Sequence, residues 1–196
     1  MPGRIAHLIS IALLAAAAAG CASAQARFYT LDPTASPNGA PVADAAVMVG
    51  PVTIPAAVDQ PQFVVQVAPN RVALDEFNRW AAPLNDSIAR AVAGDLAVQL
   101  GTPDVATAPL ANFAPTYAAT IQVQRFDSIR GEAALLDAVW TVRKTANGET
   151  RSGRTTAREA VQGDSFDALA AAHSRALAKL SGDIAAAIRA EAEQNP

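Results

Sequence analysis

The sequence contains few of the groups that most often carry out catalysis or hold metals. It has one cysteine, Cys21, and two histidines among 196 residues, so an internal disulfide is excluded. Zinc sites need several cysteine, histidine or carboxylate ligands at suitable spacing, and neither an HExxH nor a CxxC motif occurs. We therefore expect neither a zinc site nor a disulfide framework.

The short motifs of nucleophilic and nucleotide-dependent enzymes are also absent. There is no G-x-S-x-G elbow, no S-x-x-K and neither glycine-rich phosphate-binding pattern. His173 and Ser174 are neighbours, but consecutive side chains on a helix point about 100° apart. We expect His173 to lie in or beside the apolar stripe of a helix.

Paired carboxylates are the remaining route to an enzyme. Asp75 and Glu76 are adjacent, so in an extended segment they face opposite sides and cannot flank one bond together. Asp127, Glu132 and Asp137 surround a predicted connection between strands, where we expect solvated charges. A periplasmic hydrolase stays a minor alternative, and we expect the protein not to be an enzyme.

After the first twenty residues the sequence has no long apolar run. Within them, basic Arg4 precedes an apolar run from residue 5 to residue 19, and small residues follow. This order is typical of a secretory signal, and the run is shorter than the roughly 20 residues of a spanning helix. We assign residues 1–20 to a signal peptide.

Two processing sites compete at the end of this segment. The sequence AAGC, residues 18–21, resembles the bacterial lipobox, although Ala18 stands where leucine is usual. Lipidation would also account for a lone thiol in an oxidising compartment, and Ala22 in the second mature position favours the outer membrane. The alternative is cleavage after Ala24, which would release a soluble periplasmic protein.

Basic residues are too few for a nucleic-acid-binding protein. The removed segment holds Arg4 and no acid, so 14 basic and 18 acidic residues remain, a net charge of −4. Binding to nucleic acid needs a concentrated basic surface. We expect no nucleic-acid partner.

Strand patterns begin close to the cleavage sites. Residues 21–45 are rich in alanine, proline and serine, and we interpret them as a lipidated tether that holds one short strand, FYTL. Residues 47–54 form a strand with a break at Gly50-Pro51, and residues 62–67 form another between prolines. The main domain is assigned to residues 46–196.

Two helices and a hairpin follow. Apolar residues recur every four positions from Leu84 to Leu100, which predicts a helix that ends at Gly101. A second stripe from Phe166 to Ile188 predicts a long helix with Asp164 or Ser165 as N-cap.

Alternating strands lie between the two helices, at about residues 117–123, 136–142 and 149–160, and Asn147-Gly148 is a hairpin-turn signal. Because the strands come in runs, we expect an α+β fold with a mostly antiparallel sheet and two main helices on one face.

The stretch DEFNRWAAPL, residues 75–84, carries an unusual density of functional groups. We interpret it as the connection from a strand into the first helix, with Phe77 and Trp80 on one face of a single turn as a structural brace. Aromatic and arginine side chains are also common anchors of protein interfaces. A partner surface formed with Asn70 and Arg71 is therefore the alternative interpretation.

Several motifs together resemble one family. They are FYTLDP (28–33), VGPVTIPAAVDQPQFVVQ (49–66), NRVALDEFNRWAAPL (70–84) and FDALAAAHSRALAKLSGDIAAAI (166–188). In this order they resemble the ABC-type transport auxiliary lipoproteins, of which the PqiC-like proteins are a branch. The resemblance spans essentially the whole mature chain.

The resemblance implies a lipoprotein accessory to a transporter. It implies lipid attachment at Cys21 with no other cofactor, an ABC transporter and an MCE-domain protein as partners, and contact with outer-membrane lipid. A homo-oligomeric ring that receives the end of an MCE tube, and so completes a path for lipids, would fit this role. The alternative is a direct carrier of lipid or lipopolysaccharide, with an apolar pocket between sheet and helices.

Overall fold

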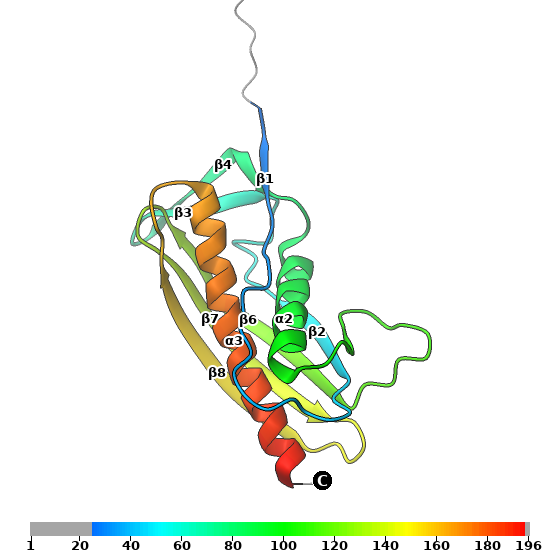
Figure 1. The fold of residues 1–196 in the computed structure, drawn as a ribbon. Helices are drawn as coiled ribbons and strands as arrows, with labels where there is room; N and C mark the ends of the chain where they lie inside the picture. The colour runs from blue at the N-terminus through cyan, green and yellow to red at the C-terminus, as the bar shows by residue number, and fades with distance from the viewer. Residues whose placement is uncertain (1–24, 195–196) are drawn as a thin grey trace, which may run out of the picture.

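The computed structural model describes residues 25–194, so the predicted signal peptide and Cys21 lie outside the described residues. Eight strands form one sheet, and two helices accompany it in this part of the chain (Figure 1). The elements are β1 (Arg27–Tyr29), β2 (Val47–Thr53), β3 (Gln62–Ala68), β4 (Arg71–Trp80), α2 (Leu84–Leu100), β5 (Val105–Ala106), β6 (Tyr117–Ile129), β7 (Ala133–Lys144), β8 (Thr150–Ala160) and α3 (Phe166–Gln194).

The sheet is mixed, which corrects one detail of the expected fold. β3–β4, β6–β7 and β7–β8 pair antiparallel, as predicted. However, β2 and β3 both pair with the same edge of β6, and both run parallel to it. The pairs β1–β4 and β2–β5 are parallel as well. The helix between β4 and β6 supplies the long crossover that parallel pairing needs. The α+β class and the single domain are confirmed.

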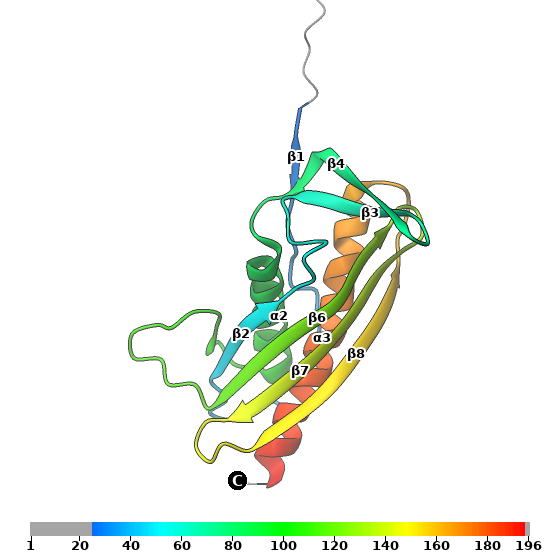
Figure 2. The same cartoon turned by 180° about the vertical axis from the view of Figure 1, so that it is seen from behind.

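Both helices cover the same face of the sheet, as predicted. α3 packs on β6, β7 and β8, and α2 packs on β2 and against α3. Figure 2 shows the opposite face of β6–β8, which no helix covers. Gly101 ends α2 with a φ of 66°, and its N–H donates to the carbonyl of Ala97. The Ser165 hydroxyl accepts the N–H of Ala168, which identifies Ser165 as the N-cap of α3.

The predicted strand signals also match the structure. The Asn147-Gly148 turn joins β7 to β8, and Gly148 has a φ of 77°, a conformation that glycine adopts at little cost. The register of β2 against β6 shifts between Val49 and Val52, at the predicted break. The hairpin and the irregularity at Gly50-Pro51 are therefore confirmed.

Aromatic side chains fill the core at one end of the sheet. The rings of Phe63 and Trp80 lie 4.0 Å apart, and Phe166 contacts Phe63 edge-on at 5.2 Å. Elsewhere the core between sheet and helices is mostly aliphatic, and its largest fully buried aliphatic members are Ile88, Leu96, Leu100, Ile121, Leu136, Leu169, Leu177, Leu180, Ile184 and Ile188. Burial of this apolar area is the main favourable term in folding.

His173 is part of this core, as its position in the helix pattern predicted. It is fully buried, stacks on Phe126 at 3.9 Å between ring centroids, and its Nε2 lies 2.8 Å from the Ser128 hydroxyl. Burial penalises the charged imidazolium and lowers the pKa of His173 to about 3. The side chain is therefore neutral at physiological pH.

Residues 30–45, which we call the strap, differ from the expected tether. They run between α2 and α3 and then turn toward β2 (Figure 1). The carboxylate of Asp95 in α2 is fully buried and accepts the backbone N–H groups of Thr34 and Ala35 at 2.7 and 2.8 Å. Ser181 of α3 donates to the other oxygen of Asp95, so this carboxylate joins three segments.

The second half of the strap is fixed as well. Arg189 of α3 donates to Asn38 and to the carbonyl of Ala40, and the Val42 N–H donates to the carbonyl of Leu100. The strap therefore belongs to the folded body. The expected tether over residues 21–45 is therefore corrected for residues 30–45, because backbone groups of the strap form hydrogen bonds with both helices.

A glycine allows the close approach of the strap. A Cβ at Gly94 would lie only 2.3 Å from Cγ of Pro33. Pro33 thus packs directly on the backbone of α2, which only glycine permits without displacement.

We expect Asp95→Ala to destabilise the protein by about 2–4 kcal/mol, because it leaves two buried backbone N–H groups without an acceptor. Urea denaturation measures this free energy of unfolding. Asp32→Ala is the matched control, since Asp32 is an exposed carboxylate in the same strap, and we expect a change below about 0.5 kcal/mol. Equal effects of the two variants would contradict the role of Asp95.

His173 predicts a pH dependence of stability. Between its folded pKa of about 3 and its ordinary value of 6.5, the unfolded chain binds a proton that the folded chain does not. The contribution of His173 to the free energy of unfolding is therefore fully present above pH 6.5 and is lost as the pH falls. We expect a loss of about 2 kcal/mol from pH 7 to pH 5. In His173→Gln, which keeps every other titrating group, the loss should be smaller by this amount.

Candidate functional site

The stretch singled out in the sequence, residues 75–84, begins inside a strand. β4 runs from Arg71 to Trp80 and pairs antiparallel with β3, and the turn between them lies at residues 69–70. The expectation that residues 75–84 connect a strand to a helix is therefore wrong for residues 75–80, which belong to β4. Its charged residues are compatible with a strand because they lie at the edge of the sheet, where polar side chains reach solvent.

Asp75 shapes an irregularity in this strand. Its Oδ1 accepts the backbone N–H groups of Phe77 and Asn78 and the side-chain amide of Asn78, at 2.8–3.0 Å. The register against β3 shifts between Gln62 and Phe63, next to these bonds. Partial burial raises the pKa of the Asp75 carboxyl, but the hydrogen bonds outweigh burial and hold it below its usual value.

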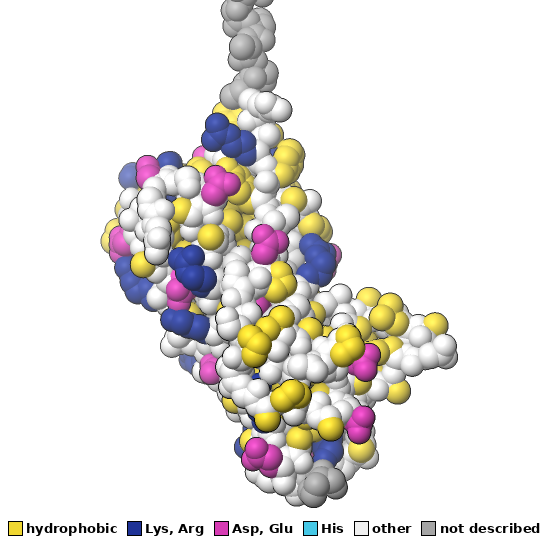
Figure 3. Space-filling model, in the orientation of Figure 1, with side chains coloured by type: hydrophobic (Ala, Val, Ile, Leu, Met, Phe, Trp, Pro, Cys, Tyr) yellow, Lys and Arg dark blue, Asp and Glu magenta, His cyan; other side chains and the backbone are white. Residues whose placement is uncertain are grey.

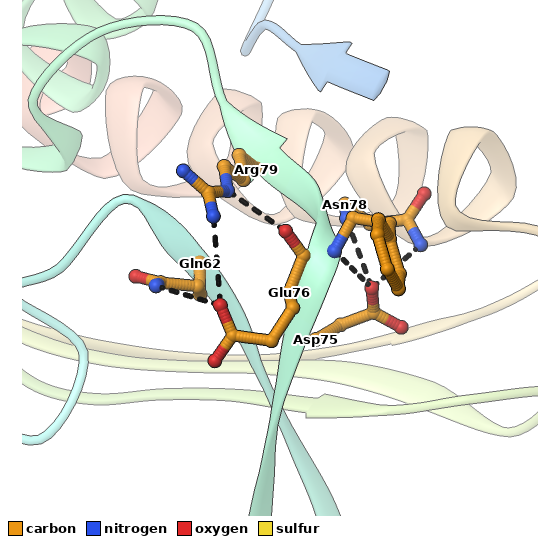
Figure 4. Close-up of polar contacts among 6 residues, drawn as sticks. Gln62, Asp75, Glu76, Asn78 and Arg79 are labelled. Carbon is orange, nitrogen blue, oxygen red and sulfur yellow. Dashed lines mark hydrogen bonds and ion pairs between the residues drawn. The ribbon is translucent and has the colours of Figure 1, made fainter. Parts of the chain in front are cut away.

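The two neighbouring carboxylates point to opposite sides of β4, as predicted. Figure 4 shows Asp75 beside Asn78, whereas Glu76 lies with Gln62 and Arg79 on the other side. The Glu76 carboxylate accepts from Gln62 at 3.3 Å and from Arg79 at 3.5 Å. These carboxylates cannot act together on one bond.

A chain of polar contacts continues from Asp75 to β1. The hydroxyl of Tyr29 donates to Asn78 at 2.7 Å, and this pair is buried. The N–H of Ala81 donates to the carbonyl of Tyr29 at 2.9 Å. Asp75, Asn78 and Tyr29 thus fix the first strand to the end of β4.

Trp80 and Phe77 do not share a face, contrary to expectation. Trp80 is 6% exposed and packs against Phe63, Phe126 and His173 in the core. Phe77 is 48% exposed. Residues three positions apart in a strand face opposite sides, so Trp80 lies in the core, in the position expected of a brace, and Phe77 lies on the surface.

Asn70 and Arg71 line a hollow of about 280 Å³ beside the β3–β4 turn. Apolar side chains and Ser128 form much of the rest of its wall. Arg71 makes no ion pair within residues 25–194, whereas Arg125, on the same wall, pairs with Asp127. The hollow thus places the guanidinium of Arg71, which has no ion pair among the described residues, next to apolar surface.

The other carboxylates considered in the sequence are engaged with arginines. Asp127 pairs with Arg125, Glu132 with Arg158 and Asp137 with Arg154. Asp127 and Asp137 lie within β6 and β7, so only Glu132 occupies the predicted connection. The hydrogen bond from Arg154 lowers the pKa of the Asp137 carboxyl, which is opposite to the shift that a general acid needs.

The described residues form neither a metal site nor a helix that could cross a membrane. Among residues 25–194, no group of three or more histidine, cysteine, aspartate or glutamate side chains could hold a metal ion. No helix of these residues has the length and apolar character needed to cross a membrane.

Exposed apolar residues gather at the β1 and β3–β4 end of the molecule. We call this set the end patch, and it consists of Phe28, Val67, Val72, Leu74 and Phe77. The sequence patterns pointed only to Phe77. Val72 and Leu74 lie in the segment that was expected to be a connection, and Phe28 and Val67 lie in predicted strands for which no exposed apolar face was predicted. The sequence V-x-L-x-x-F over residues 72–77 carried a signal, since a strand that pairs on one side only leaves such residues on the surface.

Similar proteins share this fold. One is an uncharacterized protein whose crystal structure is 20% identical, with a TM-score of 0.70 over 84% of this chain and 99% of that one. Another, from Xanthomonas campestris, is also 20% identical, with a TM-score of 0.66 over 81% of this chain and 92% of that one. No curated protein matches the sequence.

The family is identified by a match over most of the described chain. The model for the ABC-type transport auxiliary lipoprotein component matches residues 29–185, from the end of β1 to within α3. The match includes the strap, both helices and the whole of the β4 stretch discussed above. This chain belongs to the family of ABC-type transport auxiliary lipoprotein components.

Proposed function

We propose that this protein is an accessory lipoprotein anchored at the periplasmic face of the outer membrane, where it docks a transport system of the ABC and MCE type. The observation that carries the proposal is the family match over residues 29–185. This match covers the folded body and describes an auxiliary component of a transporter. Trafficking of lipid or another apolar molecule is the transport that this arrangement would serve.

Cys21 is the attachment point in this proposal. Two or more acyl chains are needed for stable anchoring, as on a processed lipoprotein cysteine. The strap supports this role, because its contacts with α2 and α3 hold the chain firmly from residue 30 onward. The body is therefore connected to Cys21 by only a short segment.

The polar groups of the body support binding rather than catalysis. Asp95 holds the strap, Asp75 holds the irregularity in β4, and Asp137 pairs with Arg154. Each of these carboxylates has a structural partner. A docking module is not required to present reactive groups.

The structure gives less support to a direct lipid carrier. Such a carrier needs an apolar cavity, but large side chains such as Leu177 and Ile184 fill the space between sheet and helices and are fully buried. The hollow beside Arg71 is about 280 Å³, at the lower limit of ordinary ligand pockets. A hollow of about 550 Å³ beside the strap is lined by charged side chains as well as apolar ones, namely Asp44, Lys144, Arg189 and Glu193. Docking is therefore the function we favour, and several copies in a ring would extend the docking surface.

We expect Cys21→Ala to move the protein from the outer-membrane fraction to the soluble periplasmic fraction, because the acyl chains are lost. Fractionation of cells on a density gradient, with immunoblotting, measures this. Ser23→Ala is the matched control, since it changes a neighbour and leaves Cys21 in place. Unchanged outer-membrane location of the Cys21→Ala protein would refute the anchor.

We expect a photo-crosslinker on the body to capture an MCE-domain protein in cells that contain both. Exposed positions on different elements are suitable, namely Val98 on α2, Leu110 in the loop before β6 and Thr156 on β8. Mass spectrometry identifies the product, and samples kept from light are the control. If no position captures an MCE-domain protein, the docking role fails while the anchor is unaffected.

A further inference from the structure

Among residues 25–194, five of the seven large hydrophobic side chains that are well exposed lie in the end patch. Phe28 is 64% exposed, and Val72 is 57% exposed. Figure 3 shows hydrophobic and basic side chains side by side at this end of the molecule, next to the start of the described chain. Apolar surface that is concentrated in this way and bordered by polar groups marks an interaction site.

The strand that carries most of the patch has a free edge. β1 pairs with β4 only from Asn78 to Trp80, so residues 71–77 have β3 as their single neighbouring strand in the described sheet. Edge strands of soluble proteins are usually covered or carry charges that prevent association. Here the edge presents Val72, Leu74 and Phe77 beside the exposed charges of Arg71 and Glu76.

The position of the patch relative to Cys21 indicates what covers it. Arg27 lies six positions after Cys21, so the two are at most about 20 Å apart even when the chain is fully extended. Phe28 follows Arg27 directly in β1, and β1 pairs with the residues of β4 next to Phe77, so this side of the end patch lies close to the segment that leads to Cys21. α3 has 29 residues and is about 44 Å long, so its C-terminal end lies beyond that distance.

The charges at this end fit a phospholipid surface. Arg27 and Arg71 make no ion pair within residues 25–194, although Arg79 pairs with Glu76. Guanidinium groups that no carboxylate neutralises attract lipid phosphates, and each basic residue near an anionic membrane adds to binding. Phenylalanine and aliphatic side chains between them can enter the boundary between headgroups and acyl chains.

We propose that the end patch, with Arg27 and Arg71, rests on the phospholipid surface in which Cys21 is anchored. The inference rests on the lipid anchor of the proposed function and adds a second, non-covalent contact to it. The acyl chains hold the protein at the membrane, and the patch sets its orientation. With β1 and the β3–β4 hairpin on the bilayer, α3 directs its C-terminal end away from the membrane.

Depth-dependent quenching tests this orientation in the acylated full-length protein. The protein is reconstituted in vesicles of phosphatidylethanolamine and phosphatidylglycerol that contain brominated lipid. The two native tryptophans, Trp80 and Trp140, are both buried, and they provide the baseline. We expect Phe28→Trp to add fluorescence that brominated lipid quenches, and Leu110→Trp, an equally exposed control outside the patch, to add fluorescence that it does not quench. Equal quenching at the two positions would overturn the proposal.

A partition measurement tests the patch without the acyl chains. The mature Cys21→Ala chain is sedimented with vesicles of the same two phospholipids. We expect Phe28→Ser combined with Phe77→Ser to lower the partition coefficient about tenfold or more, and Val98→Ser combined with Leu110→Ser to leave it within about twofold. Arg27→Gln with Arg71→Gln should lower binding to these vesicles and not to vesicles of phosphatidylcholine alone.

The outcomes separate this proposal from its alternatives. If the protein without vesicles is a dimer that Phe28→Ser and Phe77→Ser dissociate, the patch binds a second copy and the proposal is wrong. If those variants instead lose capture of an MCE-domain protein and keep vesicle binding, the patch binds that partner and the proposal is again wrong. Loss of vesicle binding in these variants, with no dimer to dissociate, supports the proposal, and this measurement does not need the docking role to be correct.

Discussion

The buried carboxylate of Asp95 is the interaction on which the arrangement of this protein depends. It lies on α2, accepts two backbone N–H groups from the strap and receives a hydroxyl from α3. Burial raises the pKa of this carboxyl, and the hydrogen bonds from Ala35, Thr34 and Ser181 oppose that shift without cancelling it. One side chain thus fixes the strap to both helices, which in turn pack on the sheet and hold the aromatic core.

Most of the fold could be predicted from the sequence because its signals are local. The apolar repeats of the two helices, the glycine after Leu100 and the Asn147-Gly148 turn each act within a few residues. The strap could not be predicted in this way. Its composition is that of a linker, and its order depends on Asp95 and Arg189, which lie about 60 and 150 positions away and carry no pattern of their own.

The candidate site, too, could be predicted from the sequence only in part. Local spacing correctly predicted that Asp75 and Glu76 face opposite sides, because alternation is a property of any extended chain. It failed for Phe77 and Trp80, since it assumed a single turn, whereas residues three positions apart in the strand β4 face opposite sides. The exposed residues of the end patch follow from the pairing of β4 with β3 and, only at its end, with β1, which depends on the whole fold.

The strap also determines how the body would respond to mechanical load. Tension on a lipid anchor would enter the body at β1, whose three residues pair parallel with Asn78–Trp80, and would continue into the backbone held by Asp95. A pull along the strand axis strains these hydrogen bonds together rather than one after another. β1 and the strap therefore make the first part of the described chain resistant to a pull applied at its start.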